Sequence, residues 1–227
     1  MTTESAHAII SAILPPGAVG VDALGGIPDA QLFPEEAAVV ERAVEKRRRE
    51  FAAGRCLARR ALECLGIPAM PILPGSNREP QWPEGVVGAI THCSGYCAAA
   101  VALSDSVAAI GIDAELNAAL PDGVLRMVAR EEEREWIHAR TGDTISWDRL
   151  LFSAKESVYK AWFPLTHRWL DFDAVSVRFD PEAAIFHATL LTDGPIVDSR
   201  VIAGFDGRYL AHGPYLLTSV AVRRSGD

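Results

Sequence analysis

A helical pattern of apolar positions runs from Glu35 to Leu65, and Gly66 followed by Pro68 is a common sequence for the end of a helix. The apolar residues recur three and four positions apart, so they line one face of the expected helix. Arg47 and Arg55 border this apolar stripe. Their side chains either cover its edge with their carbon chains or reach over it into a neighbouring cleft, and the pattern leaves both explanations open.

A second helical pattern runs from Trp147 to Phe163, with Ser146 as the expected N-cap and Pro164 as the expected end. Glu156 projects away from the apolar stripe of this helix, and Lys160 lies about 40° from it around the helix axis. A surface ion pair four residues apart would give the same pattern. Taken alone, Glu156 and Lys160 therefore do not establish a site.

Short β-prone runs separated by turns occupy much of the remaining chain. We expect an irregular segment with a short strand or helix over residues 1–34, and a helical region around Val124 to Arg140. A long helix followed by antiparallel strands occurs twice, which predicts an α+β fold. The expected strands are Val86–Thr91, Cys97–Leu103, Val107–Ile112, Ala174–Phe179, Ile185–Leu191 and Leu216–Val222.

Two acidic residues, Asp113 and Glu115, directly follow the expected strand Val107–Ile112. Because they are two positions apart, they lie on the same side of an extended backbone. A solvated strand end would explain them equally well if they stood alone. Together with Glu156 and Lys160, they supply three carboxylates and one ammonium group, which suits a divalent cation that bridges phosphate oxygens.

Composition narrows the classes of function. The chain has 227 residues, 49% of them hydrophobic, which is enough for one compact unit or two small subdomains. A net charge of −8 argues against general binding of nucleic acid, which needs a concentrated basic surface. No stretch is long and apolar enough to span a membrane, and Met1–Ser5 has no basic head of a signal peptide. We expect a cytoplasmic protein that binds neither nucleic acid nor membrane.

The cysteine pattern gives no metal site. Cys56, Cys64, Cys93 and Cys97 have neither the density of a disulfide scaffold nor the paired spacing of a zinc site. We expect reduced and mostly buried thiols. His92, next to Cys93, has no role that its sequence position alone would establish.

The two chemical motifs also match a family. Gly111–Glu115 and Phe152–Lys160 resemble the G-[IV]-D-x-E and [FW]-[SC]-x-K-E-[SA]-x-x-K motifs of surfactin-type and enterobactin-type 4′-phosphopantetheinyl transferases, and the chain looks like their actinobacterial members. The resemblance runs from Arg47 to about Leu170. It also covers Arg47–Phe51, Arg55, Gly75–Pro83, Thr91 and His92, in the family order.

The resemblance implies a reaction and a division of roles. Such an enzyme transfers the 4′-phosphopantetheine arm of coenzyme A to a serine of an apo acyl or peptidyl carrier protein and releases adenosine 3′,5′-bisphosphate. Asp113, Glu115 and Glu156 would hold Mg²⁺, or alternatively Mn²⁺. Glu156 would take the serine proton, directly or through a water, and Lys160 would neutralise the leaving phosphate.

The resemblance also assigns the groups that hold coenzyme A. Arg47 and Arg55 would bind its 3′-phosphate, for which a forked guanidinium is suited, and the pair Thr91 and His92 would contact its phosphate, as would Lys160. The chain lacks a lysine that some members carry around residue 74, and we expect Arg78 to compensate. This chain also has Ala89 at a position where members of the family frequently have a serine.

The fold implied by the resemblance has two similar α/β subdomains, 1–105 and 106–227, related by a pseudo-two-fold. Each would pack a small antiparallel sheet on a long helix, with the active site between them. We expect a monomer that docks its carrier through Leu116–Val124 and Phe163–Leu170, where His167 and Arg168 would meet an acidic partner. A non-catalytic module that binds coenzyme A, and a Mg²⁺-dependent phosphate hydrolase, are the alternatives.

Overall fold

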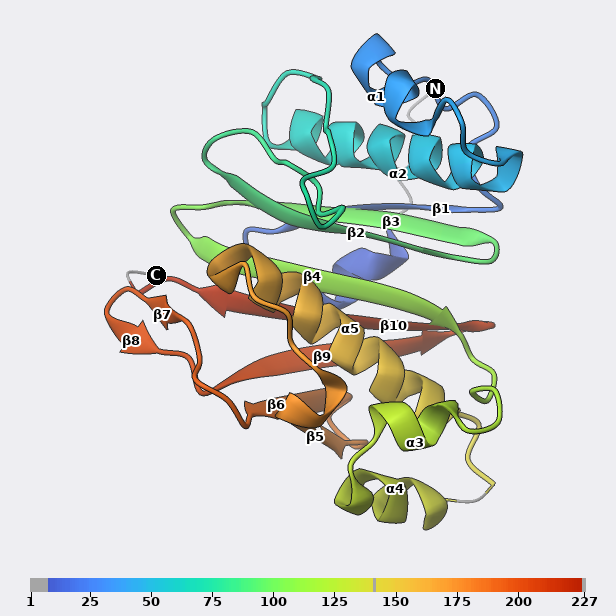
Figure 1. Ribbon diagram of the computed structural model, residues 1–227, viewed down its shortest axis with the longest axis vertical. Helices are drawn as coiled ribbons and strands as arrows, with labels where there is room; N and C mark the ends of the chain where they lie inside the picture. The colour runs from blue at the N-terminus through green and yellow to red at the C-terminus, as the bar shows by residue number, and fades with distance from the viewer. Residues whose placement is uncertain (1–7, 141, 226–227) are drawn as a thin grey trace, which may run out of the picture.

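The computed structural model describes residues 8–140 and 142–225. Two antiparallel sheets lie next to each other, and one long helix packs on each (Figure 1). The first sheet has the strand order β1-β3-β2 and packs on α2. The elements of this half are η1 (Ile9–Ile13), β1 (Val19–Leu24), α1 (Pro34–Val40), α2 (Glu45–Cys64), β2 (Val86–Cys93) and β3 (Tyr96–Leu103).

The second sheet has five strands in the order β4-β10-β9-β6-β5, and α5 packs along β4 and β10. Two short helices, α3 and α4, precede α5. The elements are β4 (Val107–Leu116), α3 (Val124–Val128), α4 (Glu131–His138), α5 (Trp147–Thr166), η2 (Phe172–Ala174), β5 (Val175–Asp180), β6 (Ile185–Leu190), β7 (Ile196–Val197), β8 (Arg200–Val201), β9 (Gly204–His212) and β10 (Tyr215–Arg223).

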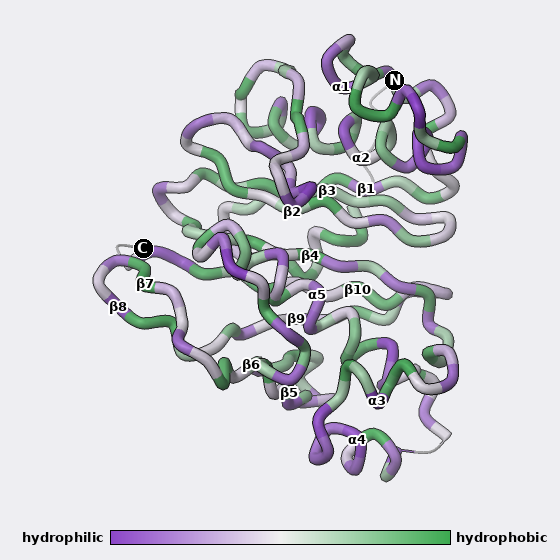
Figure 2. The backbone as a smooth tube through the Cα atoms, viewed as in Figure 1, coloured by the Kyte–Doolittle hydropathy of each residue, from purple (hydrophilic) through white to green (hydrophobic). Residues whose placement is uncertain are grey.

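Small side chains allow the two sheets to approach each other. Ala98, Ala100 and Ala102 of β3 are buried in one apolar cluster with Ile110 and Ile112 of β4, and η1 closes this cluster. In Figure 2 the strands between α2 and α5 are mostly in the hydrophobic colour, whereas α4 is mostly hydrophilic. The two halves thus share a core, and β2 and β4 run beside each other at their boundary.

The single helix expected over Glu35–Leu65 is wrong, because the chain forms two helices there, α1 and α2. A buried ion pair explains the break: Arg59 Nη1 lies 2.7 Å from Glu36 Oε2. In one continuous helix these residues would stand about 35 Å apart along the axis, at about 1.5 Å per residue. The chain folds back at residues 41–44 so that the two charges meet.

The end expected at Pro164 is also wrong, since α5 continues to Thr166. Within the last turn a proline removes only one helical hydrogen bond. His167 then takes a left-handed conformation with φ 52°, and its N–H donates to the Phe163 carbonyl. Ser146 does occupy the N-cap position, but its side chain makes no capping bond.

The expected strands are all present, and β4 is longer than expected. Because it runs to Leu116, Asp113 and Glu115 lie within the strand and not beyond its end. A short strand or helix was expected within residues 1–34, and the chain forms both η1 and β1 there, whereas β7, β8 and β9 were not expected. The α+β class is confirmed, while the pseudo-two-fold and the division near residue 105 stay predictions.

Two further expectations have clear outcomes. All four cysteines are free, but only Cys97 is fully buried, so the expectation of mostly buried thiols is wrong. Among the described residues, no helix is both long enough and apolar enough to cross a membrane.

Candidate functional site

The candidate site forms where α5 lies against β4. Gly111 makes this approach possible, because a β-carbon on it would overlap the backbone carbonyl oxygen of Ser157 in α5. The helix can therefore lie directly on the strand. As a result, Lys160 Nζ donates to the Ile112 carbonyl at 3.0 Å and to Asp113 Oδ1 at 2.8 Å.

Asp113 is the centre of the arrangement. Its side chain is 8% exposed, and Oδ1 accepts hydrogen bonds from both Lys160 Nζ and Thr91 Oγ1, the latter at 3.1 Å. Its other oxygen, Oδ2, is buried and has no hydrogen-bond partner among the described residues. Leaving a buried carboxylate oxygen unpartnered is costly, and a bound cation would remove that cost.

Glu115 and Glu156 lie near Asp113 and share its electrostatic environment. Burial is the main cause that raises the pKa of each, and the negative charge of Asp113 raises both further. Arg149 opposes this at Glu115, where its Nη1 donates to Oε2 at 3.0 Å. Lys160 opposes it at Glu156. Crowded carboxylates of this kind are typical of sites for a hard divalent cation.

In this conformation the three carboxylates are neighbours without forming a finished coordination sphere. Within residues 8–140 and 142–225, no three His, Cys, Asp or Glu side chains are grouped closely enough to hold a metal ion. Glu115 is turned toward Arg149 and Asp113 toward Lys160. The metal role of Asp113, Glu115 and Glu156 stays a prediction.

Arg47 and His92 lie together at the edge of the first sheet, with Arg47 Nη1 3.5 Å from His92 Nε2. Neighbouring groups partly desolvate the His92 ring and lower its pKa, and the charge of Arg47 lowers it further. A cavity of about 1170 Å³ opens beside His92 and Cys93, bounded by the first turns of α2 and by Gly25. His92 lines this cavity and Arg47 does not, so it is their direct contact that brings these two exposed residues together.

Arg55 is held differently from Arg47. Its guanidinium is buried, its Nε donates to the Ile72 carbonyl at 2.7 Å, and it lies over the Phe51 ring. Burial lowers the pKa of Arg55 to about 10. Arg78, by contrast, is exposed, with a left-handed φ of 68° in a turn that Gly75 begins. The structure shows no contact that would join Arg78 to Arg47 or Arg55.

Sequence reasoning missed Arg149, which organises one side of the site. Its Nε donates to the Ala118 carbonyl, its Nη2 donates to the Ala119 carbonyl, and its Nη1 holds Glu115. A signal existed in the sequence, because Arg149 precedes Glu156 by seven residues. Two helical turns place these residues on the same face.

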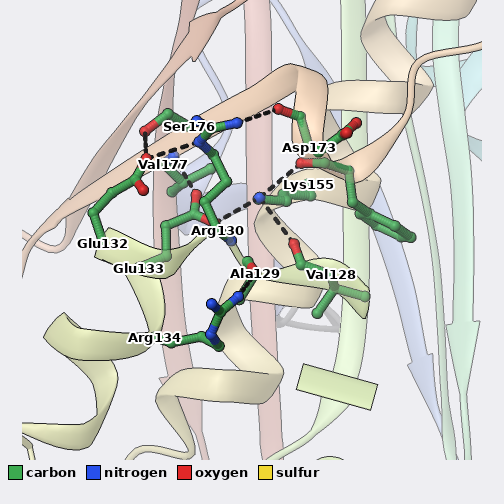
Figure 3. Close-up of polar contacts among 11 residues, drawn as sticks. Val128, Ala129, Arg130, Glu132, Glu133, Arg134, Lys155, Asp173, Ser176 and Val177 are labelled. Carbon is green, nitrogen blue, oxygen red and sulfur yellow. Dashed lines mark hydrogen bonds and ion pairs between the residues drawn. The ribbon is translucent and has the colours of Figure 1, made fainter. Parts of the chain in front are cut away.

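The first lysine of the α5 motif, Lys155, has its polar partners outside the carboxylate cluster, and Figure 3 shows it among residues of α4 and the segments around it. Its buried Nζ donates to Glu133 Oε2 at 2.7 Å and to the carbonyls of Val128 and Phe172, both at 2.9 Å. Glu133 also accepts the Val177 N–H. Lys155 therefore fastens α3, α4 and the start of β5 to α5, and it does so from inside the protein.

Comparison with known proteins matches both halves of the chain. A model described as the 4′-phosphopantetheinyl transferase N-terminal domain matches residues 35–102, and one described as the 4′-phosphopantetheinyl transferase superfamily matches residues 109–210. The second range includes Asp113, Glu115, Glu156 and Lys160.

Three relatives are similar over most of their length. The chain is 52% identical to 4′-phosphopantetheinyl transferase Svp of Streptomyces mobaraensis over 94% of this chain and 89% of that protein. It is 43% identical to 4′-phosphopantetheinyl transferase Npt of Nocardia iowensis, over 94% and 99%. Its identity to 4′-phosphopantetheinyl transferase PptT of Mycobacterium tuberculosis is 41%, over 86% and 88%.

Proposed function

Because the chain belongs to the 4′-phosphopantetheinyl transferase superfamily, and so transfers the phosphopantetheine group of coenzyme A to carrier proteins, we propose that the reaction takes place where α5 meets β4. The main support is Asp113, with Oδ1 bonded to Lys160 and Thr91 and with Oδ2 buried and free. In this reaction a carrier serine oxygen forms a bond to the β-phosphorus of coenzyme A. The bond from that phosphorus to the leaving adenosine 3′,5′-bisphosphate breaks.

The residues at the site fit a divalent cation. Asp113, Glu115 and Glu156 would hold Mg²⁺, with Mn²⁺ as an alternative, and the unpartnered Asp113 Oδ2 supports this assignment. Such an ion supplies positive charge for the pyrophosphate oxygens. Glu115 must exchange its bond to Arg149 for this role.

Glu156 accepts the serine proton in the proposed reaction, directly or through a water. Burial raises the pKa of Glu156 above that of a free glutamate, which makes the carboxylate a stronger proton acceptor. Glu156 lies on the side of α5 that borders the other two carboxylates and not on the side that packs in the core. The route through water suits a carboxylate that also holds the metal.

Lys160 stabilises the charge that develops on the departing phosphate. Its Nζ already lies 2.8 Å from Asp113 Oδ1, and its side chain is 26% exposed, so it can reach a phosphate at the mouth of the site. An ammonium group placed there before the reaction needs little reorganisation as the phosphorus–oxygen bond breaks.

Coenzyme A would be held by its 3′-phosphate at the edge of the first sheet. Arg47 and His92 are neighbours there, and Arg47 is exposed with its forked guanidinium available. Arg55 would contribute from its more buried position, and Arg78 would close over the phosphate from the Gly75 turn.

The carrier would dock on Leu116–Val124 and Phe163–Leu170, which border the site. Leu116 and Trp169 expose apolar surface there, 37% and 71% respectively. Arg168 adds a positive charge, although one of its nitrogens donates to the Asp193 carbonyl. The protein would act as a monomer. If Arg168→Glu leaves carrier affinity unchanged, this docking surface is wrong.

The test is to incubate the protein with coenzyme A, Mg²⁺ and an apo carrier, and to measure the carrier mass. With wild type we expect the carrier to gain the mass of one phosphopantetheine group. Asp113→Asn and Glu156→Gln should lower the rate by at least about a hundredfold, whereas Glu131→Gln, at an exposed position, should keep the wild-type rate. Folded Asp113→Asn or Glu156→Gln that works at the wild-type rate would remove that residue from the mechanism. Cleavage of coenzyme A without a carrier would favour a hydrolase, and binding without cleavage a regulatory module.

A further inference from the structure

Thr91 makes contacts that differ from those of a phosphate-binding residue. It lies on β2 of the first sheet and is 3% exposed. Its hydroxyl donates to Asp113 Oδ1 at 3.1 Å and accepts the Ala114 N–H at 3.0 Å, and both partners belong to β4 of the second sheet. One threonine side chain thus joins the two halves of the molecule at the acidic strand.

These contacts use the hydroxyl proton. A threonine hydroxyl can donate one hydrogen bond, and here the acceptor is Asp113 Oδ1. To donate to a phosphate of coenzyme A, Thr91 would have to release Asp113 and become exposed. His92, which follows it in β2 and points to solvent, has no such restriction.

The consequence for Asp113 is a fixed orientation. Thr91 and Lys160 both bond to Oδ1, one from each half of the molecule, and this leaves Oδ2 as the oxygen without a partner. The Ala114 N–H bond fixes the rotamer of Thr91 itself, so the hydroxyl is aimed at Asp113 before any ligand arrives. A group held in this way costs little to order when a cation binds.

We infer that Thr91 is a positioning residue that orients Asp113 for the divalent cation, and that it does not bind the phosphate of coenzyme A. This inference rests on the proposed metal role of Asp113. It assigns the two neighbours in β2 to different tasks, with Thr91 acting on the metal side and His92 on the side of coenzyme A.

The test compares Thr91→Val, which keeps the shape but loses the hydroxyl, with Thr91→Ser, which keeps the hydroxyl. Two affinities are measured for each full-length variant: coenzyme A by calorimetry in a chelator, and Mn²⁺ by electron paramagnetic resonance at saturating coenzyme A. We expect Thr91→Val to weaken Mn²⁺ binding about tenfold or more and to change the dissociation constant of coenzyme A by less than about twofold. Thr91→Ser should stay close to wild type in both.

A matched control separates positioning from simple loss of stability. Ser219 of β10 is 3% exposed, and its hydroxyl donates to the Ile13 carbonyl of η1. It lies on the opposite face of the strand from Thr218, whose hydroxyl contacts α5. Ser219→Ala should lower the melting temperature, as Thr91→Val does, but should keep Mn²⁺ affinity.

The inference is overturned if Thr91→Val weakens coenzyme A binding in the chelator tenfold, or if it leaves Mn²⁺ binding unchanged. It is also overturned if wild type binds no Mn²⁺, or if Ser219→Ala weakens Mn²⁺ binding equally. None of these readouts requires turnover. A wild-type protein that binds Mn²⁺ but does not modify a carrier would refute the proposed function and leave the role of Thr91 standing.

Discussion

Gly111 of β4 lies so close to Ser157 of α5 that a β-carbon on the glycine would overlap the Ser157 carbonyl oxygen. The overlap would be with backbone, which cannot swing aside as a flexible side chain can. Every contact between Lys160 and Asp113 depends on this approach, because α5 carries the lysine and β4 carries the aspartate.

Gly111→Ala should therefore move α5 away from β4. We expect a loss of about 1–3 kcal/mol in the free energy of unfolding, as is typical for overpacked cores, and a fall in carrier modification of about a hundredfold. Chemical denaturation and carrier mass spectrometry measure the two effects. Gly85→Ala is the control, because a β-carbon there meets nothing within 4 Å and only its left-handed φ of 79° is strained. Equal activity loss in both variants would contradict the packing argument.

Lys155→Met should act on stability and not on chemistry. It leaves the buried Glu133 without its ion-pair partner, which costs about 3–5 kcal/mol in comparable cases. Urea denaturation measures this loss. The fraction that remains folded at low temperature should retain the wild-type dependence of the rate on coenzyme A concentration. A folded Lys155→Met with normal stability and no activity would show that Lys155 takes part in the reaction.

Arg47→Ala should distinguish coenzyme A from 3′-dephospho-coenzyme A. The variant loses a charge-assisted hydrogen bond to the 3′-phosphate. We therefore expect its KM for coenzyme A to rise about tenfold or more, and its KM for the dephospho form to change little. Arg49→Ala on the same helix is the control, because Arg49 is 78% exposed and pairs with Glu45. If Arg47→Ala affects both donors equally, Arg47 does not bind the 3′-phosphate.

Glu156→Gln should raise stability in a pH-dependent way when no metal is present. A carboxyl whose pKa is raised by folding binds its proton more tightly in the folded chain, so its contribution to stability is present at low pH and is lost as pH rises through the folded-state pKa. Removing that ionisation should increase the melting temperature at pH 8, by about 2–4 °C for each ~1 kcal/mol, and should have no effect well below pH 4.5.

Thermal unfolding in a chelator across this pH range checks the sign. The control is Glu182→Gln, since Glu182 is exposed and lies outside the site. A melting temperature of Glu156→Gln that falls below wild type at pH 8 would mean that Glu156 is stabilised by a partner and not destabilised by burial.

Periodicity and motif spacing predicted the parts of the site that depend on local structure. Glu156 and Lys160 lie on one side of α5 because a helix repeats every 3.6 residues, and Asp113 and Glu115 share a face of β4 because a strand repeats every two. The contact between Lys160 and Asp113 follows once α5 packs on β4. The resemblance indicated that these segments belong to one site.

Contacts between distant segments could not be predicted in the same way. The break between α1 and α2 depends on the Glu36–Arg59 ion pair, whose partners are separated by 23 residues. Lys155 stands next to Glu156 in the sequence but finds its partner Glu133 on the opposite side of α5. Pattern gives the face of a helix on which a charge lies, but only packing determines which charge it meets.

In the proposed site, Asp113, Glu115 and Glu156 hold one divalent cation against coenzyme A. Crystals grown with coenzyme A and Mn²⁺, measured near the manganese absorption edge, give the most direct test. We expect an anomalous peak beside Asp113 Oδ2, with carboxylate oxygens or their bound waters about 2–2.4 Å away and with Glu115 released from Arg149. A peak bound by the pyrophosphate alone, with Asp113 Oδ2 still unpartnered, would contradict the account.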